Sequence, residues 1–182
     1  DVYKRQGIYY MPIVIKAAKL GDAAIIKAII KILEKENIKV ISSVFFNPEL
    51  SLKAGSYTKL KTTIEDTKSI KKGILYFNQL NNLDHVQALI VKDNKIIATE
   101  GNQGTKKMMS KLQKKSGGIL IKLPKKKQDL RMDLPTIGLN TLRDCKKYGL
   151  RGIVLKSNKN IFLDKTKCIN FANRNKIFIK VI

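Results

Sequence analysis

Residues 117–138 read GGILIKLPKKKQDLRMDLPTIG. After two glycines, an apolar stretch up to Leu123 has the length and composition of a buried strand. A polar loop (residues 124–138) follows, with two carboxylates, an arginine, several lysines and two prolines. A buried strand that leads into a loop and then a helix is typical of α/β sheets, which bind ligands beyond the carboxyl ends of their strands. The polar loop is therefore our first candidate for a functional site.

Helical and strand patterns alternate on both sides of this loop, which indicates the α/β class. Upstream of the loop we expect a helix over 63–80, a hairpin of strands over 86–92 and 95–99 with Asp93-Asn94 at its turn, and a helix over 104–115. Downstream we expect a helix over 141–148 that ends at Gly149, strands over 152–156 and 161–163, a helix over 165–174 and a last strand over 177–182.

The N-terminal part has a different character. Residues 11–36 follow a helical pattern that Gly21 interrupts, with Asp22 as the expected N-cap of the second segment. A short strand is predicted over 39–43, and residues 44–60 look irregular. Residues 1–6 back-translate to a string that resembles the end of a sequencing-library adapter. We therefore expect residues 1–7 to be an artefact and the natural sequence to continue upstream.

Composition excludes several classes of protein. The chain has 182 residues, of which 43% are hydrophobic, so a folded core is expected rather than disorder. It contains no apolar run long enough to cross a bilayer and no signal-peptide pattern, so we predict a cytoplasmic protein. One histidine and two widely separated cysteines, Cys145 and Cys168, do not make a zinc site, and we expect both thiols to be reduced and buried.

The net charge of +23 has two readings. It matches a nucleic-acid partner or another polyanion, because basic side chains displace counterions from phosphates. However, only 5 of the 37 basic residues are arginine, and lysine-rich composition also results from an AT-rich genome. No nucleic-acid-binding motif accompanies the charge. We therefore expect no nucleic-acid partner, and a phosphorylated substrate or an anionic membrane surface instead.

The residues of the polar loop are suited to phosphoryl chemistry on an anionic substrate. Lysine and arginine neutralise phosphate oxygens, and a carboxylate holds a divalent metal ion or orients a water molecule. A surface charge cluster with ordinary turn prolines is the alternative. His85 has the pKa range of a general base, although a structural histidine is more common. The turn at 101–105 before a helix is either an anion site or a plain connection.

Three groups of residues together match one known pattern. In the loop these are Gln128, Arg131 and the run Asp133-Leu134-Pro135-Thr136-Ile137-Gly138. Upstream of these positions the matches are Lys122, Pro124 and Lys125, then Glu100, Gly104, Thr105 and Met108, then Asp84 and Gln87. Further matches lie at 17–22, 149–153 and 177–178. With this ordered set, nearly all of residues 11–182 resembles the metal-dependent UDP-2,3-diacylglucosamine pyrophosphatases of the LpxI type.

The resemblance implies a hydrolase of lipid A biosynthesis. Its substrate is UDP-2,3-diacylglucosamine, its products are UMP and 2,3-diacylglucosamine 1-phosphate, and its cofactor is Mg²⁺ or a similar divalent ion. Asp133 is then the catalytic residue, which binds metal, orients water or does both, with Glu100 as a second metal ligand. The substrate and phosphate contacts implied are Lys122, Lys125, Gln128, Arg131, Thr136, Thr105 and Gln87.

The resemblance also implies a domain organisation. A Rossmann-like N-terminal domain precedes a C-terminal α/β domain whose mixed sheet is flanked by helices. Residues 8–45 then correspond to a remnant of the first domain with its linking helix, and 46–182 to the catalytic domain. We expect exposed apolar surface, weak or no activity of the chain alone, peripheral contact with the inner membrane, and a homo-oligomer as one option.

The chain departs from the family pattern at three positions. Gln103 and Lys106 stand where the family has acids, and Val86 stands where it has glycine. The first two changes remove negative charge beside Glu100, which weakens the case for a metal at that turn. A non-catalytic domain that binds a lipid or a nucleotide sugar is therefore one alternative, and a basic nucleic-acid-binding module is another.

Overall fold

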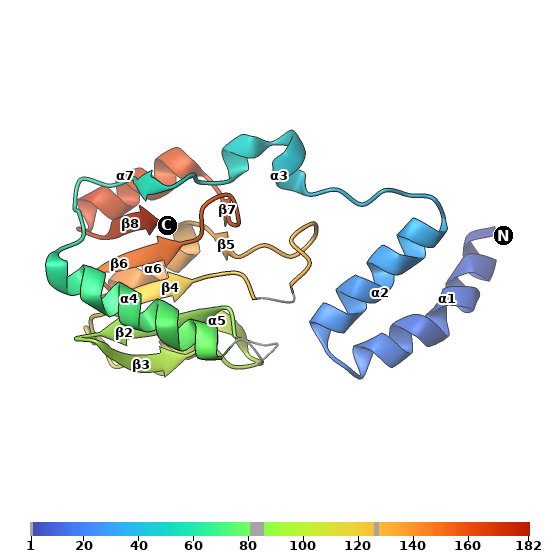
Figure 1. The fold of residues 1–182 in the computed structure, drawn as a ribbon, viewed down its shortest axis with the longest axis horizontal. Coiled ribbons are helices and arrows are strands. Elements are labelled where there is room, and N and C mark those ends of the chain that lie inside the picture. Colours follow the sequence, from blue (N-terminus) through green and yellow to red (C-terminus); the bar gives the residue numbers. More distant parts are fainter. Residues whose placement is uncertain (1, 81–85, 126–127) are drawn as a thin grey trace.

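The centre of the fold is a six-stranded mixed sheet (Figure 1). This computed structural model describes residues 2–80, 86–125 and 128–182. The strands are β1 (Gly55–Ser56), β2 (Ala88–Lys92), β3 (Lys95–Thr99), β4 (Ile119–Lys122), β6 (Gly152–Leu155) and β8 (Phe178–Val181). Their order is β1-β8-β6-β4-β2-β3, in which β4, β6 and β8 are parallel and the other pairs antiparallel. The predicted α/β class with a mixed sheet is confirmed.

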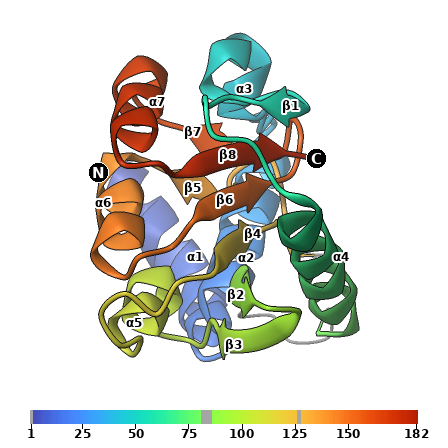
Figure 2. The same cartoon turned by 90° about the vertical axis from the view of Figure 1, so that its left-hand side faces the viewer.

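Helices cover both faces of this sheet (Figure 2). One face packs against α4 (Ile64–Gln79). The opposite face is covered by α5 (Gly104–Ser110), α6 (Leu139–Lys147) and α7 (Lys165–Arg174). Cys145 on α6 and Cys168 on α7 are buried, free thiols in this second layer, as expected. Every central strand therefore has apolar neighbours on both sides, which explains why β4 and β6 read as continuous apolar runs.

A second, two-stranded sheet anchors the end of the polar loop. It consists of β5 (Thr136–Ile137) and β7 (Ile161–Phe162), which run parallel. The β5 strand was not expected, because two residues inside a polar stretch leave no detectable alternation. The polar loop is thus held by β4 at its start and by β5 at its end.

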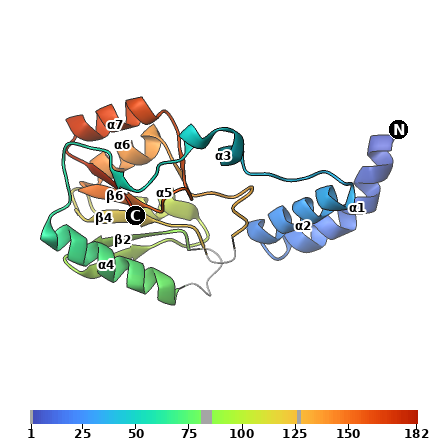
Figure 3. The same ribbon diagram turned by 45° about the horizontal axis from the view of Figure 1, so that its top comes forward.

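A helical hairpin stands beside the sheet (Figures 1 and 3). It is formed by α1 (Val2–Ala18) and α2 (Asp22–Lys35), which pack on each other. The chain then runs through α3 (Ser43–Phe46) and a 3₁₀ turn (Pro48–Leu50) to the sheet. Exposed apolar surface was expected here, and large side chains of this part are exposed: Ile8, Met11, Ile13, Ile15 and Leu20. No helix in the described ranges is long and apolar enough to cross a membrane.

Two local signals worked as predicted. Asp93 and Asn94 both have positive φ, 47° and 60°, which is the backbone of the tight turn that joins two antiparallel strands. The helix predicted over 63–80 begins with a capping box, in which Thr63 and Asp66 each bond the other's backbone N–H. We expected Ile64, Thr67, Ile70 and Ile74 to face inward. Ile70 is buried, whereas Ile64 is 72% exposed and Thr67 is exposed too.

Several boundaries were wrong. Residues 39–42 form no strand, since no neighbouring strand supplies hydrogen bonds to them and α3 begins at Ser43. Gly21 rather than Asp22 occupies the N-cap of α2. The helix predicted over 104–115 ends at Ser110. We also expected Thr105 to cap its start, but Gln103 holds the N-cap position, which leaves the Thr105 hydroxyl for another partner.

Candidate active site

The carboxyl ends of β4, β6 and β8 point towards the α1–α2 hairpin, and the polar loop lies between the two (Figures 1 and 3). This is the edge at which α/β sheets bind ligands. The end of β3 and the start of β2 lie at the same edge, since β2 is antiparallel to both β3 and β4. The fold therefore gathers three stretches that the sequence analysis selected separately.

Lys122 occupies the middle of this edge, at the last position of β4. Its Nζ donates a hydrogen bond to the Thr136 carbonyl at 3.3 Å, which links β4 to β5. Burial lowers the pKa of the Lys122 ammonium, and the carboxylates of Glu100 and Asp133 oppose this shift. The structure thus brings Lys122, Glu100 and Asp133 close to one another. We had assigned all three to the same site.

Glu100 is buried and fully engaged. Its Oε2 accepts a hydrogen bond from the Gln87 backbone N–H at 2.7 Å, and its Oε1 accepts one from the Thr105 hydroxyl at 2.6 Å. These contacts tie the start of β2 to the first turn of α5. Glu100, Gln87 and Thr105 therefore form one bracing unit behind Lys122. No signal in the sequence distinguished bracing from ligand binding for these residues.

Asp133 is in the opposite situation. It is half-buried, and its backbone N–H donates to the Asp129 carbonyl at 2.9 Å, which closes a turn in the polar loop. Within the described ranges, its carboxylate has no hydrogen bond or salt bridge. It faces a small cavity between the polar loop and α2, which is lined by Ala23, Ile26, Lys27, Lys125, Gln128, Asp129 and Asp133.

Gln128 adds an unused donor to this cavity. Its side-chain oxygen accepts from the Lys125 backbone N–H at 2.9 Å, which holds the loop closed. Its Nε2 is buried and has no hydrogen-bond partner among the residues that the structure describes. A buried donor without a partner costs about 1–3 kcal/mol, so an acceptor brought by a ligand would relieve that cost.

Arg131 ties the loop to the helical hairpin. Its guanidinium contacts Asp129 and, across the gap, Glu34 of α2, each at 2.7 Å. The guanidinium holds the pKa of Asp129 below its ordinary value, and the charge of Lys27 adds a smaller effect in the same direction. Arg131 is thus paired with carboxylates. Its predicted phosphate contact stays a prediction.

The other residues selected from the sequence are either exposed or outside the described part of the chain. Thr136 is exposed, and its hydroxyl donates to the Leu134 carbonyl at 3.1 Å. Asp84 and His85 lie outside the described residues. Lys27 was missed by the sequence analysis, because nothing on α2 distinguishes it from the other lysines until the fold places it beside Asp133.

The residues fit Mg²⁺ only in part. No group of three or more His, Cys, Asp or Glu side chains in the described ranges is arranged to hold a metal ion. Glu100 is less suited than Asp133 to bind a metal ion, because it is buried and each of its oxygens already accepts a hydrogen bond. Asp133 fits as a single ligand, since Mg²⁺ is often held by one or two carboxylates together with waters and substrate phosphates.

Comparison with known proteins gives a family model and a similar full-length protein. The family model of the LpxI C-terminal domain matches residues 53–180, which include the sheet and the polar loop. A protein from Caulobacter vibrioides, the UDP-2,3-diacylglucosamine pyrophosphatase LpxI, is 27% identical over 184 residues. The match covers 96% of this chain and 66% of that protein, so the chain spans just under two thirds of its relative's length.

Proposed function

The chain belongs to the LpxI family, and on that premise we propose that it hydrolyses the phosphoanhydride bond of UDP-2,3-diacylglucosamine. One water molecule is consumed. Its oxygen bonds to one phosphorus while the bond from that phosphorus to the bridging oxygen breaks. The products are UMP and 2,3-diacylglucosamine 1-phosphate, and the reaction belongs to lipid A biosynthesis.

The observation that carries this proposal is the carboxylate of Asp133, which has no partner among the described residues and lies near the half-buried ammonium of Lys122. An acid without partners next to fixed cations is poised to act on a bound anion. Lys122 and Lys125 would bind oxygens of the pyrophosphate, and Lys27 would contribute from α2. These charges lower the barrier because they face the phosphates, whose negative charge shifts towards the leaving oxygen as the bond breaks.

Asp133 would accept a hydrogen bond from the attacking water and orient it towards phosphorus. Gln128 would donate its unused Nε2–H to a substrate oxygen. Arg131 would act as a positioning residue, since its two ion pairs set the distance between the polar loop and α2. A bound Mg²⁺ would supply charge neutralisation at the pyrophosphate, with Asp133 as its protein ligand.

The proposed substrate carries two acyl chains, so we also propose that the protein works at the cytoplasmic surface of the inner membrane. The net charge of +23 supports this location, because anionic leaflets attract basic surfaces.

The test is release of UMP from UDP-2,3-diacylglucosamine by the purified chain, with and without Mg²⁺. Because weak activity is expected of the chain alone, the assay uses high protein concentration and long incubation, and release is compared with that of the same reaction without protein. Asp133→Asn removes the charge and keeps the shape, and Asp144→Asn on α6 is the matched control. Release that stops with Asp133→Asn and continues with Asp144→Asn supports the proposal. Binding of the substrate without any release by the wild-type protein would instead favour the binding-domain alternative.

A further inference from the structure

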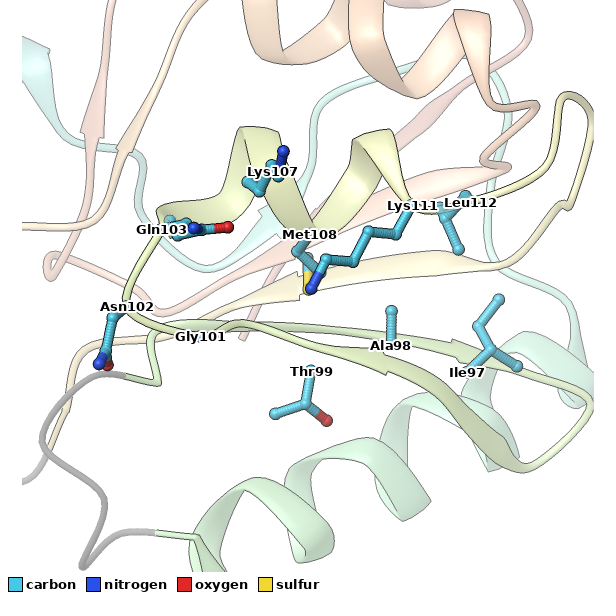
Figure 4. A pocket seen from close by; sticks show the side chains of 11 residues that line it. Ile97, Ala98, Thr99, Gly101, Asn102, Gln103, Lys107, Met108, Lys111 and Leu112 are labelled. Atoms are coloured by element: carbon cyan, nitrogen blue, oxygen red, sulfur yellow. The ribbon is translucent and has the colours of Figure 1, made fainter.

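A second cavity lies on the other side of the Glu100 unit, between strand β3 and helix α5 (Figure 4). We call it the β3–α5 groove. Its volume is about 660 Å³, inside the range of about 300–1,000 Å³ that is usual for ligand pockets. It uses none of the residues placed in the hydrolytic site above.

The floor of the groove depends on a β-bulge. Val91 pairs with Ile96 and Ile90 pairs with Ala98, so Ile97 is an extra residue in β3. Ile96 packs on the α4 side of the sheet, whereas Ala98 packs on the α5 side. The bulge lets Ile97 and Ala98 share the α5 side, as the close-up shows. Regular alternation would have sent one of them to the α4 face.

The walls combine apolar and cationic groups. Met108 of α5 and Leu112 of the turn after α5 face strand β3. With Ile97 and Ala98 they complete an apolar surface. Lys107 and Lys111 stand at the open rim, and neither forms a salt bridge with any residue that the structure describes. No acidic side chain lines the groove. This pairing of an apolar floor with free cations matches an amphiphile that has a hydrocarbon chain and a negative group.

One end of the groove lies next to Glu100. Gly101 and Gly104 line that end, and they form the turn that connects Glu100 to α5. The hydroxyl of Thr105, the residue after Gly104, donates a hydrogen bond to Glu100. This end of the groove is therefore tied to the carboxylate whose charge acts on Lys122 of the hydrolytic site.

We propose that the β3–α5 groove binds an acyl chain of a lipid phosphate, with the chain on the floor of Ile97, Ala98, Met108 and Leu112 and a phosphate at Lys107 and Lys111. This inference rests on the proposed function only for the identity of the lipid. The occupant is either the diacylated substrate itself or a separate lipid of the membrane surface, and both present the same chemistry to the groove.

The test is calorimetric titration of the full chain with dodecyl phosphate below its micelle concentration, with butyl phosphate as the short-chain control. Each buried CH₂ multiplies affinity by about fourfold, so burial of only four groups makes dodecyl phosphate about a hundredfold tighter or more. Equal affinity for the two phosphates would overturn the proposal, because it would mean that no chain is bound.

Single substitutions test whether dodecyl phosphate binds in the β3–α5 groove. Lys111→Glu should weaken dodecyl phosphate about tenfold or more at low salt, whereas Lys114→Glu, an exposed change of the same charge outside the groove, should not. Ile97→Asp should weaken it further, because a carboxylate enters the apolar floor. Circular dichroism checks that each variant is folded. Unchanged affinity in Lys111→Glu relative to Lys114→Glu would place the amphiphile elsewhere and reject the groove.

The readout is independent of turnover. Asp133→Asn should bind dodecyl phosphate like the wild type even if it releases no UMP, so loss of hydrolysis and loss of the groove are distinguishable. If dodecyl phosphate competes with UDP-2,3-diacylglucosamine in the release assay, the occupant is the substrate's own chain. Saturable binding without competition identifies a separate lipid of the membrane surface.

Discussion

The turn that carries Glu100 and the loop that carries Asp133 lie at the same edge of the sheet, yet their carboxylates are treated in opposite ways. Glu100 is buried and accepts two short hydrogen bonds, from Gln87 and Thr105. Asp133 is half-buried and has no such partner within the described ranges. The negative charges of both carboxylates raise the pKa of Lys122, against the larger effect of burial. Satisfied polar groups hold a structure together, whereas unsatisfied ones are available for chemistry, so we assign bracing to the first and reaction to the second.

The largest effect should come from removing the unsatisfied acid. Asp133→Asn should lower UMP release about a thousandfold, because the water is no longer oriented by a charged acceptor. The thermal midpoint should stay close to that of the wild type, since no hydrogen bond of the folded protein is lost. Steady-state release and a melting curve on the same preparation check both parts. A large drop in the midpoint would show that Asp133 braces the fold after all.

Removing Glu100, whose carboxylate is hydrogen-bonded, should lower the stability of the fold. Glu100→Ala leaves the half-buried Gln87 amide and Thr105 hydroxyl without their acceptor, which costs about 2–4 kcal/mol of unfolding free energy. Urea unfolding measures this loss, and Glu65→Ala, at an exposed position in the first turn of α4, is the control. If Glu100→Ala were as stable as the control but inactive, the two assignments would have to be exchanged.

A smaller effect should follow from untying the loop from α2. Arg131→Gln and Glu34→Gln each break the same exposed ion pair, so each should change stability by less than about 1 kcal/mol. Turnover should fall by about fivefold in each, because the cavity at Asp133 loses its fixed width. The double variant should be no worse than either single one. Additive losses would mean that Arg131 contacts the substrate independently of Glu34.

The subtlest prediction concerns Lys122, whose pKa is lowered by burial in the folded protein. The unfolded chain has the ordinary value of about 10.4, so folding favours the neutral amine. Its contribution to stability therefore rises as the pH increases through the folded pKa towards that value. Urea unfolding of wild type and Lys122→Met from pH 8 to 10.5 should show the wild type gaining on the variant. A widening deficit at high pH would contradict the shift.

Much of the fold could be predicted because its signals are local. Apolar runs predicted β4 and β6, the Asp93-Asn94 turn predicted the hairpin, and a helical pattern over 63–80 predicted α4. The strand expected over 39–43 failed because strand formation needs a neighbour, and local sequence does not report neighbours. The bulge at Ile97 was invisible for the same reason, since it exists only in the pairing of β3 with β2.

The members of the candidate site were proposed before the fold was known, whereas their contacts were not. Residue chemistry selected the polar loop, because carboxylates and lysines after a buried strand are the groups that phosphoryl chemistry needs. The resemblance to the LpxI type singled out Asp133, Lys122 and Glu100. Which carboxylate is free depends on distances of about 3 Å between segments far apart in the chain. Lys27 and Glu34 entered through the packing of α2 against the loop, which no pattern in α2 announces.

The sequence by itself determined the α/β class, the strand that leads into the polar loop, and the set of charged groups at its end, since these follow from periodicity and residue chemistry. Only the tertiary structure decided that Glu100 is engaged and Asp133 is open, that Arg131 is paired rather than free, and that a bulge in β3 opens a groove beside α5. The physical reason is that hydrogen bonding and burial are properties of pairs of segments, and a chain specifies those pairs only once it is folded.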